Sequence, residues 1–260
     1  MITSDSVFKH CQVILLQHAS YLRDAPCANT ESIAEQVEEV ARLLDKYMAC
    51  VKNTYPSCTA GSQGKEDEIL LELFPADTPG MYIDIGAGTP KECSNTWAMY
   101  ARSWRGLLVE PMKDHIYQLA RWRIGDVILP VAVSDYSGMM PMYAYSCQLL
   151  TSCDPEWCDD PSEPIAVECM TVTEILERGD CSQFVDADFC NIDVEGHELQ
   201  VLKGIPWDKF HPDVFCVEYR KYGTDGQGDD LSGQWEHLLL ENDYRLHATT
   251  DMNKFYVSTR

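Results

Sequence analysis

The sequence predicts an α/β fold, with a doubly wound, mostly parallel seven-stranded sheet that ends in an antiparallel hairpin. From residue 65 onward, short apolar segments alternate with helical segments, which is typical of βαβ units in a parallel sheet covered on both faces. At the end of the chain, two strand-like segments at 244–249 and 254–258 are separated only by residues 250–253. That connection is too short for a parallel crossover, so these two strands must pair antiparallel.

Seven segments supply the predicted strands, because each is an apolar run bounded by turn or helix signals. They lie at 81–85, 106–110, 126–133, 189–193, 214–218, 244–249 and 254–258. The helices between them are predicted at 66–74, 93–103, 112–122, 171–178 and 196–203, and Gly204 follows the last of these as a stop signal. Residues 142–169 show no regular period, so this segment is expected to be irregular.

The first sixty residues differ from the rest, because they predict helices only. One helix is expected at 5–22 and another at 31–52, where apolar residues recur every three or four positions. Pro26 separates the two helices, and the stretch 53–64 is rich in turn residues, as a linker is. We therefore expect a helical extension over 1–60 and a main domain over 61–260, with a homodimer through the N-terminal helices as one expected assembly.

The charge of the chain excludes several classes of partner. Its 260 residues include 42 Asp and Glu against 20 Lys and Arg, a formal net charge of −22. Such a field repels nucleic acid and anionic membrane surfaces, so neither is an expected partner. No apolar run approaches the roughly 18 residues of a membrane span, and no signal peptide is visible. We therefore expect a cytoplasmic protein whose twelve cysteines are thiols.

Acidic residues stand at or just after the ends of five predicted strands: Asp84, Glu110, Asp135, Asp193 and Glu218. In an open α/β sheet, ligands bind outside the carboxyl ends of the strands. Surface decoration alone does not explain acids at so many strand ends. The sequence therefore places a candidate binding site at this edge of the sheet.

The first motif of this site is a glycine turn that follows Asp84. Gly86 and Gly88 allow a tight turn and close approach of a ligand, but Lys91 stands where a dinucleotide-binding fingerprint needs its third glycine. Glu110 ends the next strand, where a carboxylate can accept both hydroxyls of a ribose. An adenosyl cofactor with a cationic amino-acid part therefore suits the motif better than a dinucleotide, with Asp84 meeting its ammonium directly or through water.

Several motifs together resemble the FkbM family of methyltransferases. They are Gly80-Met-Tyr-Ile-Asp-Ile-Gly-Ala-Gly-Thr-Pro90, Ser94-Asn-Thr-Trp-Ala-Met-Tyr100, Trp104-Arg-Gly-Leu-Leu-Val-Glu-Pro111 and Asn191-Ile-Asp-Val-Glu-Gly-His-Glu-Leu-Gln-Val-Leu-Lys-Gly204. Upstream, Ser62-Gln-Gly-Lys-Glu-Asp67 resembles that family's Ser-Gln-x-Gly-Glu-Asp box with two positions shifted. The resemblance spans about 62–220 and leaves out both 1–60 and the Cys- and Asp-rich stretch 146–164.

The resemblance implies S-adenosylmethionine as methyl donor and a hydroxyl oxygen, often on a sugar or secondary metabolite, as acceptor. It also implies that one set of residues lines the cofactor: Gln63, Asp84, Gly86, Ala87, Gly88, Asn95 and Glu110. Ser134 or Asp135 is expected near the adenine.

The second motif, Asp193-x-Glu195-Gly-His197-Glu198, supplies the candidate catalytic residues Asp193, Glu195 and His197. Methylation of a hydroxyl needs the removal of a proton, by a base or with the help of a metal. A histidine at a helix N-terminus tends to stay neutral and able to accept a proton, although a purely structural role for His197 is equally compatible. Glu198 is best explained as an ordinary acid of a first helical turn.

A metal is the less favoured alternative. Asp193 and Glu218 end sequential strands and could share a divalent cation, as in catechol-type O-methyltransferases. The sequence shows no evident third ligand, so we expect a metal-free mechanism.

Rival interpretations come from the rest of the chain. Cys147, Cys153 and Cys158 lack zinc-knuckle spacing, so a zinc-stabilised module is a weak alternative. A mobile flap over the acceptor, with Tyr145 and Trp157 in contact with it, suits this stretch better. A catalytically inactive, cofactor-binding interaction protein is the remaining alternative.

Overall fold

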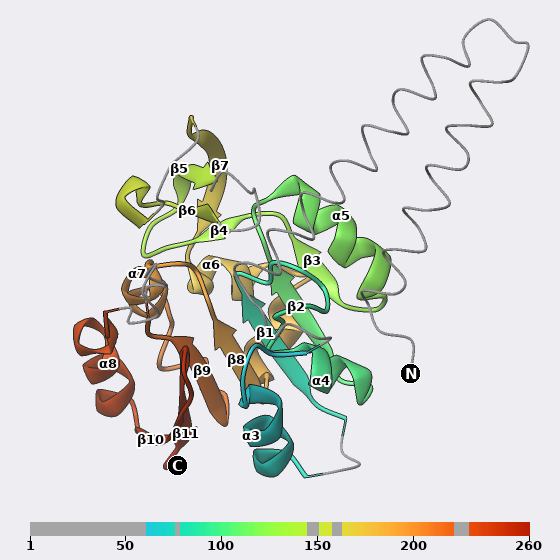
Figure 1. The fold of residues 1–260 in the computed structure, drawn as a ribbon, viewed down its shortest axis with the longest axis vertical. Coiled ribbons are helices and arrows are strands. Elements are labelled where there is room, and N and C mark those ends of the chain that lie inside the picture. The colour runs from blue at the N-terminus through green and yellow to red at the C-terminus, as the bar shows by residue number, and fades with distance from the viewer. Residues whose placement is uncertain (1–60, 76–78, 145–150, 158–162, 221–228) are drawn as a thin grey trace, which may run out of the picture. The chain divides into compact units, whose positions relative to one another are not determined.

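The computed structural model of the chain describes residues 61–75, 79–144, 151–157, 163–220 and 229–260. The two N-terminal helices, the proposed extension over 1–60, and Tyr145, Cys147 and Cys158 lie outside the described residues. Within the described part, a seven-stranded sheet forms the centre of the molecule (Figure 1).

The main sheet has the strand order β10-β11-β9-β8-β1-β2-β3. Its strands are β1 Met81–Ile85, β2 Arg105–Val109, β3 Val127–Leu129, β8 Phe189–Ile192, β9 Val214–Glu218, β10 Tyr244–Thr249 and β11 Asn253–Ser258. The five strands from β9 to β3 are parallel, whereas β11 runs antiparallel to both β9 and β10. The predicted mostly parallel sheet with a terminal antiparallel hairpin is therefore confirmed.

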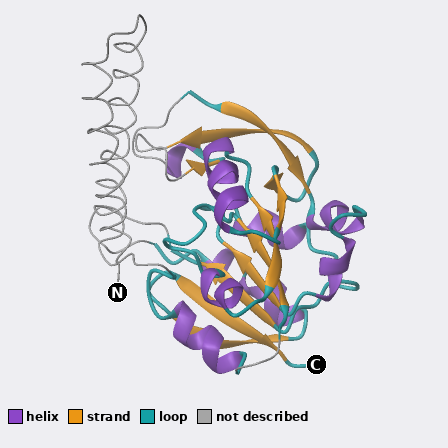
Figure 2. Cartoon of the chain, turned by 90° about the vertical axis from the view of Figure 1, so that its right-hand side faces the viewer, coloured by secondary structure: helices purple, strands orange, loops and turns teal. Residues whose placement is uncertain are grey.

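Helices cover both faces of the sheet, which Figure 2 shows from the side. They are α3 Glu66–Leu73, α4 Trp97–Ala101, α5 Lys113–Trp122, α6 Val172–Glu177, α7 Glu198–Lys203 and α8 Glu236–Glu241. Short 3-10 turns occur at η1 Pro155–Trp157, η2 Ser182–Asp186 and η3 Ser232–Gln234. The residues packed together show that α6, α7 and α8 lie on one face and α3, α4 and α5 on the other.

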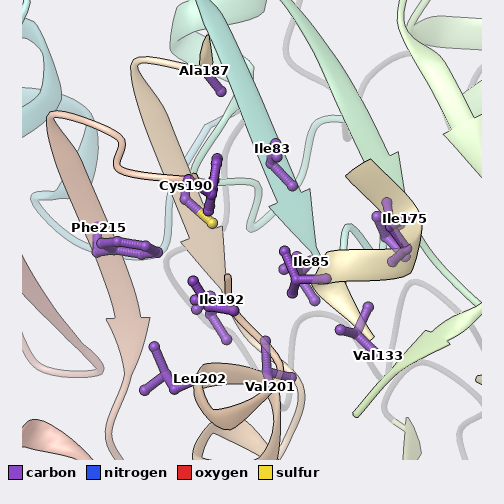
Figure 3. Packing of buried hydrophobic residues seen from close by; sticks show 14 of the residues in the cluster. Ile83, Ile85, Val133, Ile175, Ala187, Cys190, Ile192, Val201, Leu202 and Phe215 are labelled. Carbon is purple, nitrogen blue, oxygen red and sulfur yellow. The ribbon is translucent and has the colours of Figure 1, made fainter. Parts of the chain in front are cut away.

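The alternation of side chains along the central strands produces two cores. In β1, Ile83 and Ile85 face α6 and α7, while Tyr82 faces α3 and α4. Figure 3 shows the first core, where Ile83, Ile85, Cys190 and Ile192 of adjacent strands lie against the helices. Strands buried on both faces are apolar throughout, which is why these runs are visible in the sequence.

One prediction was wrong. Residues 142–169, expected to be irregular, contribute to a second sheet with the order β4-β7-β5-β6. Its strands are β4 Ala132–Val133, β5 Gly138–Ala144, β6 Thr151–Ser152 and β7 Ile165–Met170. Residues of β5 alternate between exposed and buried in the structure, but Pro141 lies in the middle of the strand. Because proline is disfavoured in a strand interior, this strand was not recognised from the sequence.

The predicted strand at 126–133 is two strands in the structure. β3 belongs to the main sheet and β4 to the second, and Pro130 lies between them. Because proline has no N–H group to donate to a ladder, the pairing of the first strand stops before it. The chain therefore leaves the main sheet at this point and crosses toward β7.

Two further expectations concern the environment of the chain. Cys93 is disulfide-bonded, so the expectation that all cysteines are thiols was wrong at this position. Cys153, Cys169, Cys181, Cys190 and Cys216 are free thiols. Disulfides are more common in oxidising compartments, so the cysteines no longer support the expected cytoplasmic location. In the described part of the chain, no helix is long and apolar enough to cross a membrane.

Candidate active site

The glycine turn after β1 lies directly against the second motif. Gly86 adopts a φ of 82° and Gly88 a φ of 52°, both in the left-handed region. A Cβ atom at Gly86 would stand 1.8 Å from the carbonyl oxygen of Asp193, so only glycine fits there. Ala87, between the two glycines, is buried. The cofactor motif and the candidate catalytic motif therefore share one edge of the sheet.

Glu110 is held at the end of β2 and faces the same turn. Its side chain is only 4% exposed, and its two oxygens accept the N–H groups of Gly88 at 2.9 Å and Met112 at 2.8 Å. The Nδ1 atom of His115 lies 3.5 Å from the Glu110 carboxylate. Burial lowers the pKa of His115, but the neighbouring carboxylate outweighs burial and the pKa is raised. Each Glu110 oxygen retains acceptor capacity, so two ribose hydroxyls can bind there.

Asp84 has a different environment from the one expected of an ammonium ligand. Its side chain is 2% exposed, and its two oxygens accept from Thr96 Oγ1 at 2.6 Å and Asn191 Nδ2 at 2.9 Å. Asn95 in turn donates to Asn191 Oδ1 at 3.1 Å. Burial raises the pKa of Asp84 despite these bonds. The network favours a role for Asp84 and Asn95 in positioning the turn over direct contact with the cofactor.

Arg123, which sequence reasoning missed, is hydrogen-bonded to this network through Thr96. It is 1% exposed, and its Nη2 atom donates to Tyr82 Oη at 2.7 Å and to Thr96 Oγ1 at 2.8 Å. Its Nε atom forms an ion pair with Asp126 at 3.0 Å. Arg123 follows the last residue of the amphipathic helix α5, and nothing in the sequence indicates that its side chain points inward. Arg123 thus connects α5 to the residue that holds Asp84.

The remaining predicted cofactor residues lie in two places. Gln63 is half-buried and follows Gly61, whose backbone bonds to the segment at 91–94. Ser134 is fully buried and its Oγ atom contacts Asp135 Oδ1 at 3.2 Å and His197 Nε2 at 3.0 Å. The structure therefore joins Ser134 and Asp135 to the second motif rather than to Glu110.

His197 has both ring nitrogens engaged by the protein. Nε2 faces Ser134, and Nδ1 lies 3.1 Å from the Sγ atom of Cys153. Burial lowers the pKa of His197, so the imidazole is neutral, as the sequence predicts. A neutral ring with both nitrogens occupied favours the structural interpretation of His197 over that of the catalytic base.

Three carboxylates gather beside the turn: those of Asp193, Glu195 and Glu218. One oxygen of each lies within 4.8 Å of the others. Glu218 is only 6% exposed, while Asp193 and Glu195 are half-buried and form the accessible side of the group. We call this group the carboxylate cluster. Sequence reasoning paired Asp193 with Glu218 but missed Glu195 as the third member, because its φ of 55° turns the backbone in a way that residue spacing does not reveal.

Burial and mutual repulsion change the acidity of the carboxylate cluster. Burial raises the pKa of Asp193 to about 6, and burial together with the charge of Asp193 raises that of Glu195 to about 8. The pKa of Glu218 lies well above its ordinary value, from burial first and then from the charges of Asp193 and Glu195. Carboxylates in this range can accept a proton near neutral pH.

Glu198 belongs to the motif but not to the cluster. Its Oε1 atom accepts the backbone N–H groups of Val194 at 3.2 Å and Gly196 at 3.1 Å. These bonds close the turn that carries Glu195. The sequence interpretation of Glu198 as an acid of the first helical turn with a structural role agrees with this geometry.

Residues 151–157, the described part of the segment expected to be a mobile flap, contact the cluster. Trp157 is buried, and its Nε1 atom donates to Glu195 Oε2 at 2.8 Å. Ser152 Oγ donates to the carbonyl of Glu195 at 2.8 Å. A Cβ atom at Gly196 would stand 2.4 Å from the Trp157 ring, so the ring lies flat on the glycine. Trp157 therefore orients a carboxylate, which sequence spacing alone does not predict.

Comparison with known proteins identifies the family of the chain. The family model described as the methyltransferase FkbM domain matches residues 84–246. The matched range contains the glycine turn, Glu110 and all three members of the carboxylate cluster. No curated protein matches the chain.

Three solved structures resemble the chain at low identity. Precorrin-6y C5,15-methyltransferase from Geobacter metallireducens GS-15 is 9% identical with a TM-score of 0.40, over 74% of this chain and 88% of that one. The Burkholderia thailandensis 1,6-didemethyltoxoflavin-N1-methyltransferase, with bound 1,6-didemethyltoxoflavin and S-adenosylhomocysteine, is 12% identical with a TM-score of 0.42, over 91% of this chain and 93% of that one. Monomeric WbdD is 13% identical with a TM-score of 0.40, over 75% and 39%.

Proposed function

The chain belongs to the FkbM methyltransferase family, and from this premise we propose that it transfers the methyl group of S-adenosylmethionine to a hydroxyl oxygen of a small molecule. The observation that carries the choice of oxygen is the carboxylate cluster, whose member Asp193 has its backbone carbonyl against Gly86 of the glycine turn. A hydroxyl acceptor must lose its proton during transfer, whereas a neutral amine attacks before losing one. A group of proton-accepting carboxylates beside the donor site therefore suits a hydroxyl.

The donor would occupy the turn between β1 and β2. Glu110 faces Gly88 from the end of β2 and offers its oxygens to the ribose. A Cβ atom at Gly88 would meet only the carbonyl of Gly86, at 3.9 Å, so the turn is open on that side. Asp84 would hold the turn in place through Thr96 and Asn191.

The transfer balances as a single displacement. The acceptor oxygen forms a bond to the methyl carbon, and the carbon–sulfur bond breaks with its electrons passing to sulfur. The hydroxyl proton passes to the carboxylate cluster, with Glu195 as the base in its ionised form, which becomes more populated as the pH rises toward its pKa of about 8. S-adenosylhomocysteine and a methyl ether are the products. Correct positioning of the two reactants supplies much of the rate enhancement.

Replacing Glu110 with alanine should weaken S-adenosylmethionine binding by about 1–3 kcal/mol, because the bonds to the ribose hydroxyls are charge-assisted. Calorimetric titration of the cofactor measures the change. Glu68→Ala, on the exposed face of α3, is the matched control and should bind as the wild type does. An unchanged affinity in Glu110→Ala would remove Glu110 from the donor site.

Mass-spectrometric detection of S-adenosylhomocysteine tests the activity itself. The protein is incubated with S-adenosylmethionine and candidate hydroxyl acceptors of sugar and secondary-metabolite type. We expect S-adenosylhomocysteine to appear in step with a product heavier by one methylene. Cofactor binding without turnover for any hydroxyl acceptor would instead support the alternative of an inactive interaction protein.

A further inference from the structure

We propose that Asp193, Glu195 and Glu218 bind one divalent cation with a preference for oxygen ligands, such as Mg²⁺ or Mn²⁺, on the acceptor side of the active site. The cluster offers three carboxylate oxygens within 4.8 Å of one another, from the ends of two adjacent strands and the turn between β8 and α7. Oxygen-only ligand sets select hard cations. Residue spacing shows no third ligand beside Asp193 and Glu218, and the fold supplies one in Glu195.

A buried carboxylate oxygen without a hydrogen-bond partner in the described part of the chain, Oε2 of Glu218, supports the inference independently of the number of acidic side chains in the cluster. Glu218 is 6% exposed, and its Oε2 atom has no hydrogen-bond partner among the described residues. A buried carboxylate oxygen without a partner costs free energy unless something neutralises it. A cation bound among the three side chains would satisfy this oxygen.

Among the described residues, no lysine or arginine forms an ion pair with the cluster. The buried Asp126, by contrast, pairs with Arg123 at 3.0 Å. The cluster therefore differs from Asp126, whose charge is matched by a neighbouring arginine.

The surroundings also suit a bound ion. Trp157 holds Oε2 of Glu195, which leaves Oε1 free to coordinate. Glu198 is occupied by the backbone N–H groups of Val194 and Gly196, so it closes the turn without competing for the ion. Asp193 and Glu195 are half-buried, which leaves coordination positions for water or for an acceptor oxygen.

The consequence for catalysis rests on the proposed function. A cation at this place would bind the acceptor hydroxyl and lower its pKa, so that the proton passes to water or a carboxylate. Acceptors with two adjacent oxygens would bind best, because they can occupy two coordination positions at once.

Mn²⁺ is a suitable probe, because the loss of the free-ion signal in electron paramagnetic resonance measures its binding without any substrate. We expect the full chain to bind Mn²⁺, and Glu218→Gln to lower the affinity at least tenfold. Glu177→Gln removes an exposed carboxylate of α6 and should bind as the wild type does. No binding at millimolar Mn²⁺, or equal binding by Glu218→Gln and wild type, would overturn the inference.

Thermal unfolding tests whether Glu218→Gln is folded, and it gives a second measure of Mn²⁺ binding. Without metal, Glu218→Gln should melt at or above the wild-type temperature, because a neutral amide replaces a buried carboxyl whose ionisation is opposed by burial and by its acidic neighbours. Mn²⁺ should raise the melting temperature of the wild type more than that of Glu218→Gln. A rise of equal size in both would contradict a site at Glu218. Because neither measurement uses methyl transfer, failure here leaves the proposed function untouched.

Discussion

Replacing Arg123 with methionine is expected to lower the free energy of unfolding by about 3–5 kcal/mol, the range for removing one partner of a buried ion pair. Arg123 and Asp126 form an ion pair whose two side chains are both 0% exposed. The guanidinium also donates to Tyr82, Ser94 and Thr96. Methionine fills a similar volume but leaves these acceptors without a donor. The loss of stability therefore comes from unsatisfied hydrogen-bond acceptors and not from a cavity.

Urea denaturation of Arg123→Met and of the control Arg121→Met measures this difference. Arg121 precedes it by two positions on α5 and is exposed, so its replacement should change stability by less than about 0.5 kcal/mol. Because Thr96 connects Arg123 to Asp84, the folded fraction of Arg123→Met should also bind the cofactor more weakly. Equal stability of the two variants would show that the buried network contributes little.

Replacing Glu195 with glutamine is expected to lower the turnover number by about 10²–10⁴-fold, the range for loss of a general base. Glutamine keeps an oxygen for the Trp157 Nε1 donor, so the turn should remain in place. It removes the negative charge, and with it the ability either to accept the acceptor proton or to bind a cation strongly. The affinity for S-adenosylmethionine should hardly change, because Glu195 lies outside the glycine turn.

His197→Ala distinguishes the carboxylate cluster from the imidazole as the base. With both ring nitrogens facing Ser134 and Cys153, we expect this variant to lose less than about tenfold in turnover. Steady-state kinetics of both variants, with Glu177→Gln as control, measure the comparison. A larger loss in His197→Ala than in Glu195→Gln, with both folded, would return the role of base to the histidine.

Features that depend on neighbours in the sequence were predictable. The apolar runs of β1, β8 and β9 lie in a sheet buried on both faces, so their composition alone reveals them. The terminal hairpin follows from the length of its loop. Gly86 was singled out as part of a tight turn, and the close approach of Asp193 explains the need for glycine.

Features that depend on distant contacts were not predictable. The inward direction of Arg123 depends on acceptors from β1 and α4, which no local pattern reveals. Glu195 joins Asp193 and Glu218 only because its backbone adopts a left-handed conformation. The contact of Trp157 with Glu195 crosses 38 positions of sequence. Each of these is a property of the assembled fold rather than of a segment.

If the carboxylate cluster accepts the proton of a hydroxyl substrate, the methyl group must end on oxygen, so we would identify the atom that receives it. The protein is incubated with S-adenosylmethionine labelled with ¹³C in the methyl group and with an acceptor that carries both hydroxyl and amino groups. Carbon NMR of the product then identifies the atom bound to the label. We expect a methyl group on oxygen, formed by the wild type and lost in Glu195→Gln. A methyl group on nitrogen or carbon, or one that Glu195→Gln transfers at the wild-type rate, would contradict it.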